Sequence, residues 1–233
     1  MRPACILTDI EGTTTAIAFV KDQLFPFAAA ALDEFLAAHA SEPAVAAILA
    51  EATALAPGEA PAAALRRWMA EDAKVTPLKT LQGLIWRQGY ATGAIKGHLW
   101  PDVAACLHAW HRAGIGLAVY SSGSEEAQRL LFRHSLAGNL EALFQGFFDT
   151  RIGTKRESAS YGAIAQALDL APERILFLSD VAEELDAALA AGMMTSQLVR
   201  PADGTEASGR HLAVADFPAL SRNFALPLPG QPG

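Results

Sequence analysis

Short apolar segments that end abruptly in polar residues are the feature that most constrains how this chain folds. The first lies at residues 6–8 and is followed at once by Asp9, Glu11 and Gly12. Such a segment is too short for a helix and is typical of a buried strand in a parallel sheet, with a turn at the glycine. Ligands bind at the carboxyl ends of strands in open α/β sheets, so the two carboxylates are candidates for chemistry. The alternative is an acidic turn that caps the next helix.

The second half of the chain repeats this pattern, with strands and helices in regular alternation. Strands are predicted at 115–120, 147–149, 174–178 and 195–199, with a possible short strand at 212–215. Helices are predicted at 101–112, 125–134, 158–168 and 182–190, and beyond residue 200 the chain is otherwise loop-like. Such alternation is typical of a parallel sheet with helices on both faces. We therefore predict an α/β fold with a doubly wound, Rossmann-like parallel sheet.

A long helical segment separates the first strand from the others. Apolar residues recur at helical spacing over 19–39, 43–55, 62–73 and 77–93, and none of these stretches reads as a strand. This pattern indicates an all-helical cap inserted into an α/β core. We predict a catalytic core of residues 1–15 and 101–225, a helical cap of residues 16–100, and a disordered Pro- and Gly-rich tail at 226–233.

Composition narrows the class of protein. The chain has 233 residues, of which 52% are hydrophobic and 18% charged, enough for a full core. The net charge of −7, without a basic stripe, argues against a nucleic-acid partner. No apolar run is long enough for a bilayer and no signal peptide is recognisable, so we expect no membrane association and a cytoplasmic location. Cys5 and Cys106 lie in apolar segments and are expected to be buried, reduced thiols.

The predicted strand ends deliver a set of polar side chains to one edge of the sheet. In chain order they are Asp9, Glu11, Ser121, Ser122, Lys155 and Asp180. Three carboxylates in one pocket would repel by about 4 kcal/mol per close pair at an intermediate dielectric. A bound cation relieves this repulsion, and all-oxygen ligands suit Mg²⁺. The serines and the lysine could then hold phosphoryl oxygens.

Two further acids follow Asp180. Glu183 and Glu184 are interpreted as solvated acids of a first helical turn, with a supporting role behind the metal ligands left open for Glu184.

The order of these residues resembles the four motifs of the haloacid dehalogenase superfamily. The motifs read Asp9-Ile10-Glu11-Gly12-Thr13, Ser121, Lys155 and Ser179-Asp180, with Glu11 where most phosphatases of the superfamily have Asp. The stretches DIEGTTT, LKTLQGLIWRQGY, VYSSGSEEAQRLLF, IGTKRESASY and ILFLSDVAEELDAA resemble the acireductone synthase family, the enolase-phosphatases of methionine salvage. This resemblance covers about residues 6–200.

The resemblance implies a function and a division of roles. A Mg²⁺-dependent enzyme of this family enolises 2,3-diketo-5-methylthiopentyl-1-phosphate and removes its phosphate, giving the acireductone. Asp9 would be the nucleophile and Glu11 the acid and base. Asp9, Glu11 and Asp180 would hold the metal, and Ser121, Ser122 and Lys155 the substrate, with Lys155 also catalytic. The resemblance favours a monomer.

Some alternatives remain open at this stage. Glu11 is our hypothesis for the base of the enolisation, although glutamate could simply be tolerated there. A phosphorylation-receiver domain also gathers carboxylates, a hydroxyl and a lysine, but its phosphorylated Asp follows a later strand and it has no cap. A dehalogenase lacks the second acid. A capped small-molecule phosphatase without enolase activity is the main alternative.

Overall fold

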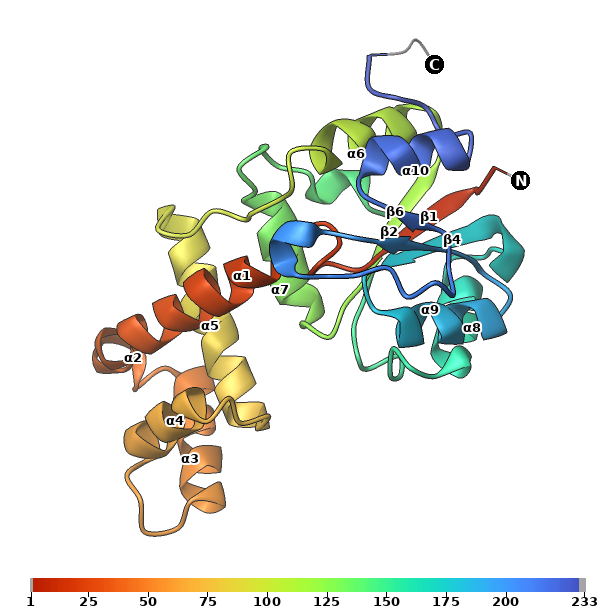
Figure 1. Cartoon of the computed structure of the whole chain (residues 1–233). Helices are drawn as coiled ribbons and strands as arrows, with labels where there is room; N and C mark the ends of the chain where they lie inside the picture. The colour runs from red at the N-terminus through yellow and green to blue at the C-terminus, as the bar shows by residue number, and fades with distance from the viewer. Residues whose placement is uncertain (1, 231–233) are drawn as a thin grey trace. The chain divides into compact units, whose positions relative to one another are not determined.

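A computed structural model of the chain describes residues 2–230. Within them, six strands form one sheet in the order β3-β2-β1-β4-β5-β6 (Figure 1). The strands are β1 Cys5–Thr8, β2 Gly116–Tyr120, β3 Gly146–Phe148, β4 Ile175–Ser179, β5 Met194–Leu198 and β6 Ala213–Val214. Every neighbouring pair is parallel. The predicted doubly wound α/β fold is confirmed, and the strand order reverses between β1 and β4.

Helices cover both faces of the sheet (Figure 1). Helices α8 (Ser158–Ala167) and α9 (Ala182–Ala190) lie on one face, and α6 (Val103–Arg112) and α10 (Phe217–Asn223) lie on the other. Helix α7 (Glu125–Arg133) packs against β3. All four residues of β1 are buried, as expected for a parallel strand covered on both sides. Trp110 of α6 stacks on Phe217 of α10, with 5.2 Å between the ring centroids.

The segment after residue 200 differs from the expected loop. Besides β6, which was predicted, it contains helix α10. The Asp216 side chain caps this helix by accepting a hydrogen bond from the Ala219 N–H at 2.6 Å, and Pro218 occupies the first turn. Leu226, the first residue of the predicted tail, is buried. Residues 231–233 of that tail lie outside the described part of the chain.

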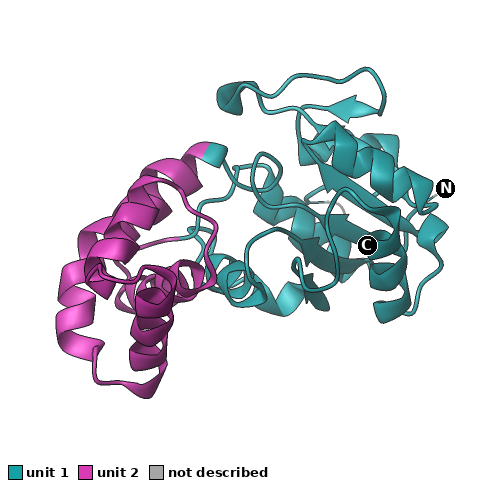
Figure 2. Cartoon of the chain, turned by 90° about the horizontal axis from the view of Figure 1, so that it is seen from below, with its two compact units in different colours: residues 1–17, 97–233 teal, residues 18–96 magenta. Residues whose placement is uncertain are grey.

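The chain divides into two compact units, residues 1–17 with 97–233 and residues 18–96 (Figure 2). The boundaries expected for the cap were 16 and 100. Helices α2 (Phe25–His39), α3 (Pro43–Leu55), α4 (Pro61–Ala70) and α5 (Thr76–Thr92) build the second unit. Its core contains buried leucines and isoleucines, among them Leu32, Ile48, Leu65, Leu81 and Ile85. No helix among residues 2–230 is long and apolar enough to cross a bilayer.

The predicted helix at 19–39 is interrupted near its start. Helix α1 (Ile17–Phe19) leads into one π-helical turn, Val20–Leu24, before α2 begins at Phe25. Pro26 explains this break, because it has no N–H to donate to the preceding turn and its ring crowds that turn's carbonyls.

Candidate active site

A cavity of about 220 Å³ lies at the carboxyl ends of the central strands, beside the point where the strand order reverses. Its lining residues are Asp9, Glu11, Ile17, Ser121, Ser122, Lys155, Asp180, Val181 and Glu184. The structure therefore brings together all six site residues predicted from the sequence. Asp9 follows β1, Ser121 follows β2 and Asp180 follows β4, so parallel pairing of these strands is what assembles the cavity.

A tight turn fixes the backbone that carries Asp9. The N–H groups of Thr13, Thr14 and Thr15 all donate to the Ile10 carbonyl, and Gly12 has a positive φ of 71°. The hydroxyls of Thr8 and Thr14 donate to the Asp9 carbonyl at 2.9 and 3.3 Å. The hydroxyls of Thr8 and Thr14 thus support the turn, and Gly12 supplies a backbone conformation that other residues rarely adopt.

Lys155 is the cation of the site. Its Nζ lies 2.7 Å from Asp9 Oδ1 and 2.6 Å from Glu184 Oε2, and its side chain is only 9% exposed. Burial opposes the charge, but the two carboxylates outweigh it and hold the pKa of Lys155 above its ordinary value. The ammonium is therefore charged and fixed beside the candidate nucleophile.

Glu184 belongs to the site, so its interpretation as a solvated acid is wrong. Besides Lys155, its Oε2 accepts a hydrogen bond from Ser179 Oγ at 2.9 Å. Burial, and then the negative charge of Asp9, raise the pKa of Glu184 to about 7. Glu183, one residue earlier, pairs instead with Arg210 at 2.9 Å, in an exposed contact. The two acids differ because the helix turns one toward the cavity and the other toward solvent.

Asp180 is held against the turn that follows β1. A Cβ added to Gly12 would lie 2.4 Å from Asp180 Oδ2, so only glycine leaves room for this carboxylate. The buried Gln197 side chain donates to the Asp180 carbonyl at 2.8 Å. Burial, and then the charge of Asp9, raise the pKa of Asp180 to about 7. The carboxylates of Asp9 and Asp180 therefore share a space in which their charges repel.

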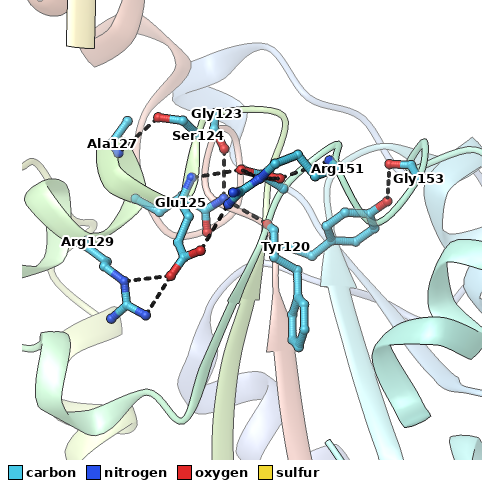
Figure 3. A network of polar contacts seen from close by, with 11 residues as sticks. Tyr120, Gly123, Ser124, Glu125, Ala127, Arg129, Arg151 and Gly153 are labelled. Carbon is cyan, nitrogen blue, oxygen red and sulfur yellow. Dashed lines mark hydrogen bonds and ion pairs between the residues drawn. The ribbon is translucent and has the colours of Figure 1, made fainter. Parts of the chain in front are cut away.

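The serine loop after β2 is anchored by a polar network (Figure 3). Ser121 is buried and its Oγ accepts from the Gly123 N–H at 3.2 Å, whereas Ser122 is exposed on the rim of the cavity. Ser124, rather than Ser122, caps α7 by accepting from the Ala127 N–H. Asp149 accepts from the Glu125 N–H and from Arg151, and so ties the end of β3 to the start of α7.

The two segments that flank the helical insertion, near residues 15–17 and 97–102, are joined by hydrogen bonds within the sheet unit. His98 Nδ1 accepts from the Ala16 N–H at 3.1 Å, and Thr15 donates to the His98 carbonyl at 2.7 Å. Arg200, which is buried, pairs with Asp102 at 2.9 Å and donates to the Thr13 carbonyl at 3.0 Å. These contacts hold the turn after β1 against the segment that returns from the insertion.

The donor set suits a hard divalent cation. Asp9 and Asp180 present carboxylate oxygens to one cavity, and the charge of Asp9 raises the pKa of Asp180. A cation such as Mg²⁺ between these two carboxylates would relieve the repulsion. Among residues 2–230 no three His, Cys, Asp or Glu side chains form a metal-binding group. Glu11 and Ser121 line the same cavity and carry further oxygen atoms.

Comparison with known proteins agrees with this geometry. The family model of haloacid dehalogenase-like hydrolases matches residues 3–192. The chain is 54% identical to Enolase-phosphatase E1 of Acidiphilium cryptum, over 98% of both chains. It is 57% identical to Enolase-phosphatase E1 of Granulibacter bethesdensis, over 97% of this chain and 99% of the other. The chain belongs to the enolase-phosphatase family of haloacid dehalogenase-like hydrolases.

Solved structures agree with the family at the level of fold. The UTR4 protein of Saccharomyces cerevisiae superposes with a TM-score of 0.79 at 30% identity, covering 92% of this chain and 98% of that one. CbbY of Rhodobacter sphaeroides, solved with phosphate, has a TM-score of 0.58 at 21% identity over 92% and 95% of the two chains, and shares the fold.

Several residues that support the site in this enolase-phosphatase family member are not predicted by the sequence. Gln197 lies in β5 and Arg200 just after it, and both are buried. The sequence predicts only a strand there, although a Gln inside a strand expected to be buried could have indicated a polar role. Glu184 is different, because the sequence leaves a supporting role open for it, and its ion pair with Lys155 fits that role. No local pattern singled out His98.

Proposed function

We propose that this chain is a Mg²⁺-dependent bifunctional enolase-phosphatase of methionine salvage. It would convert 2,3-diketo-5-methylthiopentyl-1-phosphate into 1,2-dihydroxy-3-keto-5-methylthiopentene and phosphate. The observation that carries the proposal is the Lys155 ammonium, 2.7 Å from Asp9 in the cavity that also contains Glu11, Ser121 and Asp180. The relatives named Enolase-phosphatase E1, at 54% and 57% identity, support the choice of reaction.

The arrangement of the acids supports a route for phosphate removal. A carboxylate oxygen of Asp9 would attack phosphorus while the bond from phosphorus to the substrate oxygen breaks, giving an aspartyl phosphate. Glu11, which lines the same cavity, would donate a proton to the departing oxygen. It would then take a proton from the water that attacks the aspartyl phosphate, which releases phosphate and restores Asp9.

General acid–base catalysis is too small to explain the reaction by itself. Such help supplies about 10²- to 10⁴-fold, whereas hydrolysis of phosphate monoesters needs accelerations of up to about 10²¹. Positioning and charge neutralisation must supply most of the rest. We propose that Lys155, the Ser121 hydroxyl and the exposed Ser122 hydroxyl bind the phosphoryl oxygens, because all three residues line the cavity. Mg²⁺, held by Asp9, Asp180 and an oxygen of Glu11, would supply Lewis-acid stabilisation of the phosphoryl charge.

Enolisation precedes phosphate removal and needs a base for the carbon-bound proton. We propose Glu11 for this role as well, because its extra methylene lengthens its reach compared with the Asp of ordinary phosphatases of the superfamily. The helical unit, residues 18–96, is proposed to act as the cap. The enzyme is proposed to be a cytoplasmic monomer.

One assay tests both steps. The ultraviolet absorbance of the enol and the release of free phosphate are followed together on the diketone phosphate, with and without Mg²⁺. We expect both signals with Mg²⁺ and no phosphate release from Asp9→Asn. In Glu11→Asp, enolisation should slow markedly, and an unchanged enolisation rate would remove the role of Glu11 as base. Phosphate release from simple sugar phosphates with an inert diketone would refute the enolase function and leave a general phosphatase.

A further inference from the structure

The loop that carries Lys155 is bound by hydroxyl groups at three successive carbonyls. Tyr120 donates to the Gly153 carbonyl at 3.0 Å, as Figure 3 shows. Ser160 Oγ donates to the Thr154 carbonyl at 2.8 Å. The Tyr161 hydroxyl donates to the carbonyl of Lys155 itself at 2.7 Å. Each peptide group from Gly153 to Lys155 therefore has a side-chain partner that comes from elsewhere in the core.

These hydroxyls are mounted on rigid supports. Tyr120 on β2 and Tyr161 on α8 are fully buried, and their rings meet edge to face with 5.5 Å between centroids. Tyr161 also packs edge-on against Phe177 of β4 at 5.0 Å. Burial raises the pKa of both phenols, so they stay protonated and remain donors. A close-packed aromatic cluster thus fixes where the hydroxyls lie.

The loop is shaped to fit this support. Gly153 has a positive φ of 138°, and a Cβ added there would lie 2.2 Å from Ser160 Oγ. A side chain at this position would push the loop away from the hydroxyl of Ser160. Glycine allows the backbone to approach the serine, and its conformation is one that other residues rarely adopt.

The consequence concerns the lysine ammonium. The Lys155 side chain has four rotatable bonds, and its Nζ contacts two carboxylates, those of Asp9 and Glu184, at 2.7 and 2.6 Å. A backbone that shifted by a fraction of an ångström would lengthen one of these contacts or move the charge away from a bound phosphoryl group. Catalytic groups need a support that holds their position this closely.

We propose that Tyr161, with Ser160 and Tyr120, is a positioning residue that holds Lys155 in place to bind the phosphoryl group of the substrate. The inference rests on the proposed function, because it takes Lys155 as a phosphoryl ligand. Tyr161 acts on the peptide group of Lys155 and does not itself touch the substrate.

The test is a double-mutant cycle read by calorimetric titration with inorganic phosphate in the presence of Mg²⁺. Tyr161→Phe removes one hydroxyl and keeps the ring packing, and Lys155→Met removes the ammonium. We expect Tyr161→Phe to weaken phosphate binding about fivefold to tenfold, the worth of one hydrogen bond. In the Lys155→Met background the same change should have no further effect. Tyr90→Phe, a buried tyrosine of the helical unit, is the matched control and should leave phosphate affinity unchanged.

If Tyr161→Phe weakens phosphate binding equally in the wild-type and Lys155→Met backgrounds, the hydroxyl has only a general structural effect and the proposal is overturned. An unchanged affinity in Tyr161→Phe would also overturn it. If that variant does not fold, Ser160→Ala enters the same cycle, because it removes the bond to the neighbouring carbonyl of Thr154. A folded wild-type protein that binds no phosphate and releases none from the diketone phosphate would instead refute the proposed function, and the inference with it.

Discussion

Removing the carboxylate of Asp180 should make the metal-free protein more stable. The folded protein raises the pKa of this carboxyl from 3.8 to about 7, first through burial and then through the charge of Asp9. Between these values the unfolded chain has lost a proton that the folded protein keeps, so the free energy of unfolding falls as the pH rises. Asp180→Asn keeps the shape of the side chain and removes its ionisation.

The size of the effect follows from the shift. About three pKa units at 1.36 kcal/mol each correspond to roughly 4 kcal/mol, which we reduce to about 2 kcal/mol because the group is partly exposed. In a chain of this length that is a gain of roughly 4–8 °C in melting temperature. The gain should be absent near pH 4, grow up to about pH 7 and then level off.

Scanning calorimetry in EDTA at pH 4, 6 and 8 measures the gain, and the exposed Glu173→Gln in the same unit is the control. The reasoning is refuted if metal-free Asp180→Asn is no more stable than wild type at pH 8. Added Mg²⁺ should reverse the order of stability, because the cation binds the wild-type carboxylate and stabilises the folded state by mass action.

Three further perturbations test other parts of the site. Gly12→Ala places a Cβ 2.4 Å from Asp180 Oδ2 at a backbone φ of 71°. We expect the Mg²⁺ affinity, measured by titration calorimetry, to fall about 10- to 100-fold because Asp180 must move. An unchanged affinity would contradict this close packing. Burial raises the pKa of Asp149, but hydrogen bonds from Arg151 and two backbone N–H groups outweigh it and lower the pKa below 3.8. The ionised Asp149 carboxylate therefore stabilises the fold above that pH, and this stabilisation is lost in acid. In urea titrations, Asp149→Asn should lower the free energy of unfolding by about 1 kcal/mol at pH 7 and by little at pH 2. Burial lowers the pKa of His98, although the charge of Asp203 opposes this shift. The contribution of the neutral His98 ring to the free energy of unfolding is therefore fully present above pH 6.5 and is lost as the pH falls through the lowered pKa. The wild type should lose stability on acidification below pH 6.5 more steeply than His98→Asn, and parallel pH profiles would show that the hinge contact does not depend on this protonation.

Much of the site could be predicted because its residues follow strands. A parallel strand reads as a short apolar run, and the residue after it lies at the carboxyl edge of the sheet whatever the rest of the chain does. Asp9, Ser121 and Asp180 each directly follow such a run. Lys155 needed the order of the motifs as well, because it lies in a loop whose path no periodicity describes.

The sequence by itself determined the doubly wound sheet, the helical insertion and six of the residues that line the cavity. Only the tertiary structure decided that Glu184 faces Lys155 while Glu183 faces solvent, that Arg200 braces the turn after β1, and that Tyr161 holds the lysine loop. The physical reason is that local patterns specify an element and its ends. The direction in which a side chain points across the core depends on how α8 and α9 pack against the sheet, which only contacts between distant segments establish.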